Sequence, residues 1–291
     1  CIAKDKKTTG LMVAVDATCS GLQILAGLAR DKSTAELVNV VPSDKPSDAY
    51  KAVAEQAKEF LPTYMHRWMN RAVCKRTVMT IPYNATKDSS RKYIREALLE
   101  EGIDPTKDEL TQVVNAVYSS MDTIVPGPMQ VMRWIKKHVG QYIRNGATEV
   151  EWVTPSGFVV NQRRDDIETT RMELQLLGRT SIRLPTGKSK PSPNKHKSST
   201  APNYIHSFDA SILHRSFTKF DEPFTVIHDS VLCRAGDMGT LNALVRETYT
   251  NIFSEECWLS KFAETINASE PPPIVGTLDP KVVSNSTYFF C

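Results

Sequence analysis

Two aspartates stand where apolar segments of the sequence end or are interrupted. Asp16 directly follows LMVAV (11–15), and Asp229 interrupts the run VIHDSVL (226–232). We interpret both runs as buried strands, and a buried ionised carboxylate is costly unless a partner compensates it. Two carboxylates on adjacent strands repel each other, and magnesium, which binds one or two carboxylates with water and phosphate, is a natural compensation. Taken alone, each aspartate is better explained as a strand-end or turn residue, and the spacing does not prove that they meet.

A basic helix carries a second group of candidates, in the segment RAVCKRTVMTIPYN (71–84). Arg71 and Lys75 are four positions apart, so both cations share one helix face. The apolar residues expected to bury the other side are Val78, Met79 and Ile81. Tyr83 follows about two turns after Lys75, and fixed cations ending in an aromatic ring suit a triphosphate with a sugar and base beyond it. The plainer interpretation is a solvated basic face.

His206 precedes Asp209 by three positions, so the two side chains are neighbours on a predicted helix. One interpretation is a pair that shares a metal ion. A hydrogen-bonded histidine of the core or of the helix surface is the interpretation that the pair alone favours.

These residues need a mixed scaffold of helices and short strands. Asp16 lies in the predicted connection between a strand and the helix that follows it. The segment FTVIHDSVL (224–232) is predicted as strand–turn–strand. Further helices are predicted at 47–82 with a break near Pro62, at 85–101, from Pro105 (capped by Asp104) to about Met121, at 129–145, at 202–217 and at 237–265. Hairpins are predicted at 149–162, turning on 155–157, and at 169–184. Because 186–200 has four lysines and no hydrophobic residue, we predict a mobile basic loop there.

Composition bounds the class of protein. The chain has 291 residues and a formal net charge of +3, from 36 Lys+Arg against 33 Asp+Glu, which permits a polyanionic partner without requiring one. The six cysteines are scattered without a C-x-x-C pair, which argues against a disulfide framework or a zinc site and favours a reducing compartment. No apolar run approaches a membrane span, and no signal peptide is recognisable. Because the sequence begins with Cys1, we expect an interior fragment of a longer protein.

Together these segments resemble the single-subunit, phage-type and mitochondrial RNA polymerases. VDATCSGLQ (15–23) is similar to motif A of that family, RAVCKRTVMTIPYN to motif B, and VIHDSVL to motif C. APNYIHSFDAS (201–211) and WVTPSGF (152–158) resemble further segments, and the order of all the matches agrees. Related DNA polymerases share the layout, but they usually read D-Y-S-Q-I-E in motif A and H-D-E in motif C.

The resemblance implies an α+β, mainly helical fold with the right-hand palm and fingers of a polymerase, lacking the N-terminal domain and thumb. The palm would comprise 1–45 and 207–291, and the fingers 46–206. The implied function is two-metal nucleotidyl transfer from ribonucleoside triphosphates to an RNA 3′ end. The implied partners are two Mg2+ ions, a DNA template with its promoter, and the RNA product, without a membrane and with a monomeric enzyme. The implied location is the cytoplasm of a host cell if the gene is a phage's, with mitochondria or plastids as alternatives.

The resemblance also assigns roles to residues of this sequence. Asp16, Asp229 and the carbonyl of Ala17 correspond to the magnesium ligands, and Arg71 and Lys75 to the triphosphate-binding residues. Asp16, Asp229, Lys75 and Tyr83 are the expected catalytic residues. The substrate-binding expectations add Tyr83 for ribose selection, His206 near the 2′-hydroxyl and His228 near the primer end. The hairpin at 169–184 corresponds to a promoter-specificity loop, whose candidate DNA-binding residues are Arg171, Glu173, Gln175, Arg179 and Arg183.

Two departures bear on the sugar site. Asn84 stands where the family usually has glycine after the tyrosine, and asparagine is the next most tolerant residue of a left-handed backbone. Pro82 removes a backbone donor, so the helix should kink or stop before Tyr83. Two other classes remain open: a related DNA polymerase, and a non-catalytic nucleic-acid-binding fragment. The sequence also leaves open whether this fragment folds or works without the missing domains.

Overall fold

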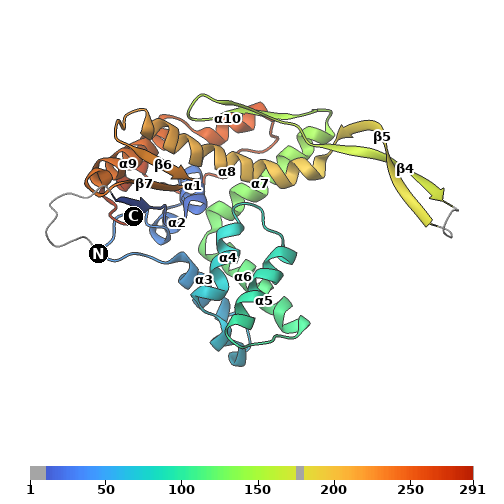
Figure 1. Ribbon diagram of the computed structural model, residues 1–291, viewed down its shortest axis with the longest axis horizontal. Coiled ribbons are helices and arrows are strands. Elements are labelled where there is room, and N and C mark those ends of the chain that lie inside the picture. Colours follow the sequence, from blue (N-terminus) through green and yellow to red (C-terminus); the bar gives the residue numbers. More distant parts are fainter. Residues whose placement is uncertain (1–10, 175–179, 291) are drawn as a thin grey trace.

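A computed structural model describes residues 11–174 and 180–290 (Figure 1). It is α+β and mainly helical, as predicted. The helices are α1 (Ser20–Ala29), α2 (Lys32–Leu37), α3 (Ala49–Lys58), η1 (Thr63–Trp68), α4 (Arg71–Thr80), α5 (Lys87–Glu100), α6 (Lys107–Ile124), α7 (Pro126–Arg144), α8 (Pro193–Phe217), η2 (Ala235–Asp237), α9 (Met238–Glu255), α10 (Trp258–Thr265) and η3 (Pro280–Asn285). The strands are β1 (Met12–Val15), β2 (Val150–Val153), β3 (Val159–Gln162), β4 (Asp165–Leu174), β5 (Thr180–Pro191), β6 (Phe224–Ile227) and β7 (Ser230–Arg234).

A three-stranded antiparallel sheet of order β1-β7-β6 joins the two ends of the chain. Val15 pairs with Val231 across β1 and β7, and Ile227 pairs with Ser230 across the β6–β7 turn. The chain then leaves β1 and enters α1, all of whose residues are buried. This helix packs against both α7 and α8. The end of β1 and the β6–β7 turn are therefore held together beside a rigid central helix.

The helices α3, α4, α5 and α6 form a second body next to the sheet (Figure 1). Polar caps fix where they begin: Asp48, Asn70, Thr86 and Thr106 each accept a hydrogen bond from a backbone N–H of the first turn. Thr106 also forms a capping box with Glu109. The expected cap at Asp104 is therefore wrong by two positions. The long helix α7 connects this body to α1 and α8, and one continuous apolar core runs through both parts.

Both predicted hairpins are present. The first, β2–β3, turns where Gly157 takes a φ of +85°, and it buries Trp152 at 4% exposure. The second, β4–β5, is longer than predicted and projects away from the rest of the molecule (Figure 1). Its tip, with Leu176, Gln175 and Arg179, lies outside the described residues.

The predicted loop at 186–200 is wrong, because β5 continues to Pro191 and α8 begins at Pro193. Ser192 caps this helix and proline occupies its first position, a start signal that the many lysines obscured. The helix also continues through Pro202, which has no N–H for the carbonyl of Ser198. The side-chain amide of Asn84 donates to that carbonyl instead, at 2.8 Å.

Four further expectations are corrected. The run 11–15 is a strand but not a buried one, since Leu11 is 64% and Val13 43% exposed. The part of the second apolar run, 226–232, that precedes Asp229 is not buried either, because every residue of β6 is exposed. Met79 is 44% exposed, because it faces a cavity rather than the core. The single helix expected at 237–265 is broken between α9 and α10. No helix in the described ranges is both long and apolar enough to cross a membrane.

Candidate active site

The largest group of predicted site residues meets in one cavity of about 410 Å³, within the usual range for small-molecule sites. The end of β1, the β6–β7 turn, α4 and α8 all contribute to its wall. Every pocket residue predicted from the sequence lines it: Asp16, Ala17, Arg71, Lys75, Tyr83, His206, His228 and Asp229. Segments more than 200 positions apart in the chain thus converge on one site, although their roles there remain predictions.

The two aspartates are held by the sheet at neighbouring strand ends. Asp16 follows β1, and Asp229 lies in the tight turn between β6 and β7, with His228 at a φ of +57°. Ser230 ties the strands together by donating its hydroxyl to the carbonyl of Val15 at 3.3 Å. Partial burial raises the pKa of Asp16, and the repulsion of Asp229 raises it further. The two carboxylates therefore interact electrostatically across the cavity.

This donor set fits a hard divalent cation. Carboxylate oxygens are the ligands that magnesium prefers, and one or two suffice because water and substrate phosphate fill the remaining positions. The backbone of Ala17 lines the same cavity and pairs with Phe290 in an isolated antiparallel bridge. Within the described ranges no group of three or more His, Cys, Asp or Glu side chains forms a complete metal cage. Asp16 and Asp229 therefore repel each other beside an open cavity.

The two cations of α4 line the same cavity. Lys75 is close enough to Asp16 to oppose the rise of its pKa. Arg71 forms an ion pair with Asp48 at 2.6 Å, and its guanidinium lies 5.4 Å from the centroid of the Tyr50 ring. Burial alone would raise the pKa of Asp48, but the hydrogen bond from Arg71 holds it below its usual value. Arg71 is therefore pre-oriented by the carboxylate of Asp48, whereas Lys75 interacts electrostatically with Asp16.

An aromatic pair closes the side of the cavity next to α8. The rings of Tyr83 and His206 are stacked, with centroids 4.5 Å apart and an interplanar angle of 10°. Pro82 does not swing Tyr83 out of the site, and Asn84 makes the turn after it in the left-handed conformation, at a φ of +64°. Gly21 leaves room for the phenol, since a Cβ there would lie 3.0 Å from the Tyr83 hydroxyl. Burial lowers the pKa of His206, and the neighbouring His228 lowers it further.

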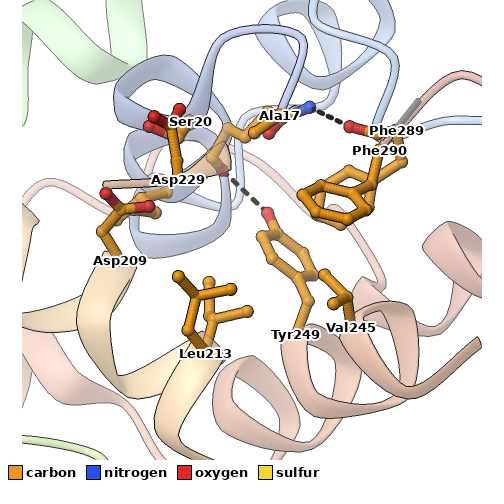
Figure 2. A pocket seen from close by; sticks show the side chains of 12 residues that line it. Ala17, Ser20, Asp209, Leu213, Asp229, Val245, Tyr249, Phe289 and Phe290 are labelled. Carbon is orange, nitrogen blue, oxygen red and sulfur yellow. Dashed lines mark hydrogen bonds between the residues drawn. The ribbon is translucent and has the colours of Figure 1, made fainter. Parts of the chain in front are cut away.

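The sequence interpretation missed one polar residue of this site, Ser20, and considered Asp209 only as the helix neighbour of His206. Figure 2 places both beside Asp229, at one side of a smaller cavity whose other side carries Val245, Tyr249 and Phe290. Burial raises the pKa of Asp209 to about 7, with further contributions from Asp229 and then Asp16. The H-x-x-D spacing pointed to Asp209, but the sequence could not reveal that α8 faces both strand ends.

The candidate DNA-binding residues lie elsewhere, on the projecting hairpin. Arg171 and Arg183 are exposed and directly opposite each other in the β4–β5 register. Glu173 is exposed two positions further along β4. Met172, between these two residues on β4, is 46% exposed, because the hairpin extends beyond the core.

Comparisons with known proteins show what this chain is similar to. The family model of DNA-dependent RNA polymerase matches residues 3–272. The human mitochondrial DNA-directed RNA polymerase is 29% identical over 96% of this chain and 25% of its own length. T7 RNA polymerase of Escherichia phage T7 is 26% identical over 96% of this chain and 40% of its own length.

A polymerase domain of Pol1 from M. smegmatis, solved with DNA primer-template and dNTP, aligns with a TM-score of 0.43 and 18% identity over 83% of this chain and 36% of that one. That level of likeness adds nothing to the assignment. This chain spans a quarter to two fifths of the curated relatives named above. The family match nevertheless covers nearly all of it, and the chain belongs to the DNA-dependent RNA polymerase family.

Proposed function

We propose that this chain carries the catalytic centre of a DNA-directed RNA polymerase, which adds ribonucleotides to an RNA 3′ end on a DNA template. The observation that carries the proposal is the single cavity shared by two repelling carboxylates, two cations and a stacked Tyr–His pair. Carboxylates and cations that line one cavity match the two ends of a metal-bound nucleoside triphosphate. Family membership supports the same reaction.

Each group has a defined task in this scheme. Asp16, Asp229 and the carbonyl of Ala17 would hold two magnesium ions, which would supply charge neutralisation for the attacking hydroxyl and the leaving pyrophosphate. Lys75 and Arg71 bind the triphosphate from the α4 side. Tyr83 and His206 contact the sugar, and His228 contacts the primer end. The reaction thereby depends on positioning and electrostatics rather than on a protein nucleophile.

The division into parts follows the fold. The β1-β7-β6 sheet with α1 and α9 would form the palm, from 1–45 and 207–291. The helices α3 to α6, with the projecting hairpin, would form the fingers within 46–206. Arg171 and Arg183 face each other as like charges, which costs stability unless an anionic partner lies between them. Promoter DNA would supply such an anionic partner if the hairpin contacts it. We further propose a monomeric enzyme that acts in a host cytoplasm if the gene is a phage's, with mitochondria or plastids as alternatives, since its relatives include phage, mitochondrial and chloroplast enzymes.

Extension of an RNA primer on a DNA template tests this proposal. The full-length enzyme that contains this chain receives one templated nucleotide, as ribo- or deoxyribonucleoside triphosphate, in Mg2+ or in excess chelator. We expect Mg2+-dependent extension with a strong ribonucleotide preference. A preference for deoxyribonucleotides would assign it to the DNA polymerases, and DNA binding without extension would make it a non-catalytic binding module.

A further inference from the structure

Two lysines come together where α7 packs against α8, outside the catalytic cavity. The methylene stem of Lys197 lies directly against Gly140 of α7, since a Cβ at Gly140 would be only 2.6 Å from the Lys197 Cδ atom. Lys136 precedes Gly140 by four positions, so it lies on the same face of α7. Both lysine side chains are half-buried. Lys136 and Lys197, called the lysine pair below, therefore hold two positive charges at one place between the helices.

No carboxylate offsets these charges within the part of the chain that the structure describes. Lys137, the next residue of α7, differs in this respect because it forms an ion pair with Glu270. Burial lowers the pKa of Lys136, and the charge of Lys197 lowers it further. Lysine is seldom buried without a partner, and two like charges repel each other. The lysine pair thus costs stability in the free protein, and an anion bound by both ammonium groups would compensate that cost.

The lysine pair lies beside the turn that follows Tyr83. Ser198, the next residue of α8, accepts the hydrogen bond of the Asn84 amide through its backbone carbonyl. A third lysine, Lys87, comes just after the same turn. Its ammonium donates to a side-chain amide oxygen at 2.8 Å and lies 5.5 Å from the centroid of the Tyr118 ring, and among the described residues it has no carboxylate partner either. Several cations without carboxylates around one turn suit a polyanionic strand better than a single small ion.

From this arrangement we infer that Lys136 and Lys197 bind one backbone phosphate of the DNA template strand, at the point where that strand enters the catalytic cavity. The inference rests on the proposed function. The triphosphate is assigned to Arg71 and Lys75 inside the cavity, so a phosphate outside it belongs to a polymer. The RNA 3′ end is assigned to His228 in the β6–β7 turn. The strand that passes the turn after α4 is therefore the template.

The alternative is that the two lysines only cover apolar surface with their methylene stems. Lys136→Met and Lys197→Met separate the two roles, because methionine keeps an unbranched stem and removes the charge. A covering role predicts unchanged DNA affinity in both variants, whereas a phosphate contact predicts a loss. Lys137→Met is the matched control, since it removes the same charge from the adjacent position of α7.

The test measures binding of the full-length enzyme to a DNA template paired with an RNA primer, without nucleotide, over a range of KCl concentrations. Lys136→Met and Lys197→Met should each weaken binding by about three- to tenfold. The double variant should reduce the slope of log affinity against log salt by about 0.7–0.9, the value for one phosphate. Lys137→Met should keep the slope of the wild type. The melting temperature of the DNA-free double variant should equal or exceed that of the wild type, because a repulsion has been removed.

Neutral methylphosphonate linkages, introduced one at a time, identify the strand that is bound. One such linkage in the template strand should weaken binding to the wild type and have no effect on the double variant. An unchanged salt slope in the double variant, an equal change in Lys137→Met, or sensitivity only to linkages in the RNA strand would each overturn the inference. Because the assay needs no RNA synthesis, an enzyme that shows this template interference but extends no primer would disprove the proposed function alone.

Discussion

The side-chain amide of Asn84 donates a 2.8 Å hydrogen bond to the backbone carbonyl of Ser198. This carbonyl lies four residues before Pro202 and lacks its helical donor for that reason. Asn84 itself has a φ of +64°, a conformation that asparagine tolerates better than most residues. One residue thus makes the turn after Tyr83 and repairs the break that Pro202 leaves in α8.

Replacing Asn84 should separate these two contributions. Asn84→Gly keeps the left-handed turn and loses only the hydrogen bond, at a cost of about 0.5–1.5 kcal/mol. Asn84→Ala also loses conformational tolerance, which adds about 1–2 kcal/mol. Urea unfolding of both variants measures the difference. Equal destabilisation of the two variants would mean that the backbone conformation contributes nothing.

The pKa of Asp209 predicts a pH dependence of stability. Asp209 is protonated in the folded chain up to about pH 7, whereas its ordinary pKa is 3.8. Between these values the unfolded chain binds fewer protons than the folded chain, so the free energy of unfolding falls as pH rises. Asp209→Asn should remove that contribution. In metal-free buffer, the wild type should lose more stability than the variant between pH 5 and pH 8, and parallel curves would contradict the assignment.

The cations of α4 should act on the triphosphate and not on the sugar. Lys75→Ala and Arg71→Ala are expected to raise KM for ribo- and deoxyribonucleotides together. Asp48→Asn keeps a side chain suited to capping α3 but weakens the ion pair that holds Arg71. Releasing an exposed pair of this kind should change KM by about two- to fivefold. A change in sugar preference in any of these variants would mean that the affected side chain contacts a part of the substrate other than the triphosphate.

The β4–β5 hairpin should determine promoter specificity. Exchanging Arg171 and Glu173 should alter the preferred promoter bases, at about 1–3 kcal/mol for each lost bidentate contact. Lys188→Gln, on the exposed neighbouring strand β5, is the matched control, and it should weaken all promoters alike. Transcription from a library of randomised promoters measures both effects. If the exchanged variant lost transcription equally from all promoters, these residues would contact only phosphates.

The parts of the site that the sequence predicted are those carried by short continuous segments. The β6–β7 turn with Asp229 and the cations of α4 follow from local patterns of apolar, polar and turn residues. The presence of Ser20 and Asp209 beside them did not, because it depends on how α8 packs against α1. The burial of 11–15 was wrong for a related reason, since apolar character alone does not supply a covering layer.

The start of α8 shows a different limit of prediction from sequence. Ser192 and Pro193 form a standard helix beginning, but Pro202 a few turns later argues against a helix that continues. The contact that resolves the conflict comes from Asn84, which is 114 positions away from Ser198. Helix propensity summed over a short stretch of sequence cannot detect a hydrogen-bond donor that comes from another part of the fold.

Single-turnover nucleotide addition by Asp16→Asn and Asp229→Asn variants tests the central claim most directly. Each substitution removes a negative charge while keeping the side-chain volume, so the cavity would lose its affinity for divalent cations. Asp122→Asn, which removes an exposed carboxylate paired with Arg133 on the surface, is the matched control. The account predicts that both cavity variants lose Mg2+-dependent addition and keep DNA affinity near that of the wild type, while the control stays active. Robust Mg2+-dependent addition by either cavity variant would contradict it.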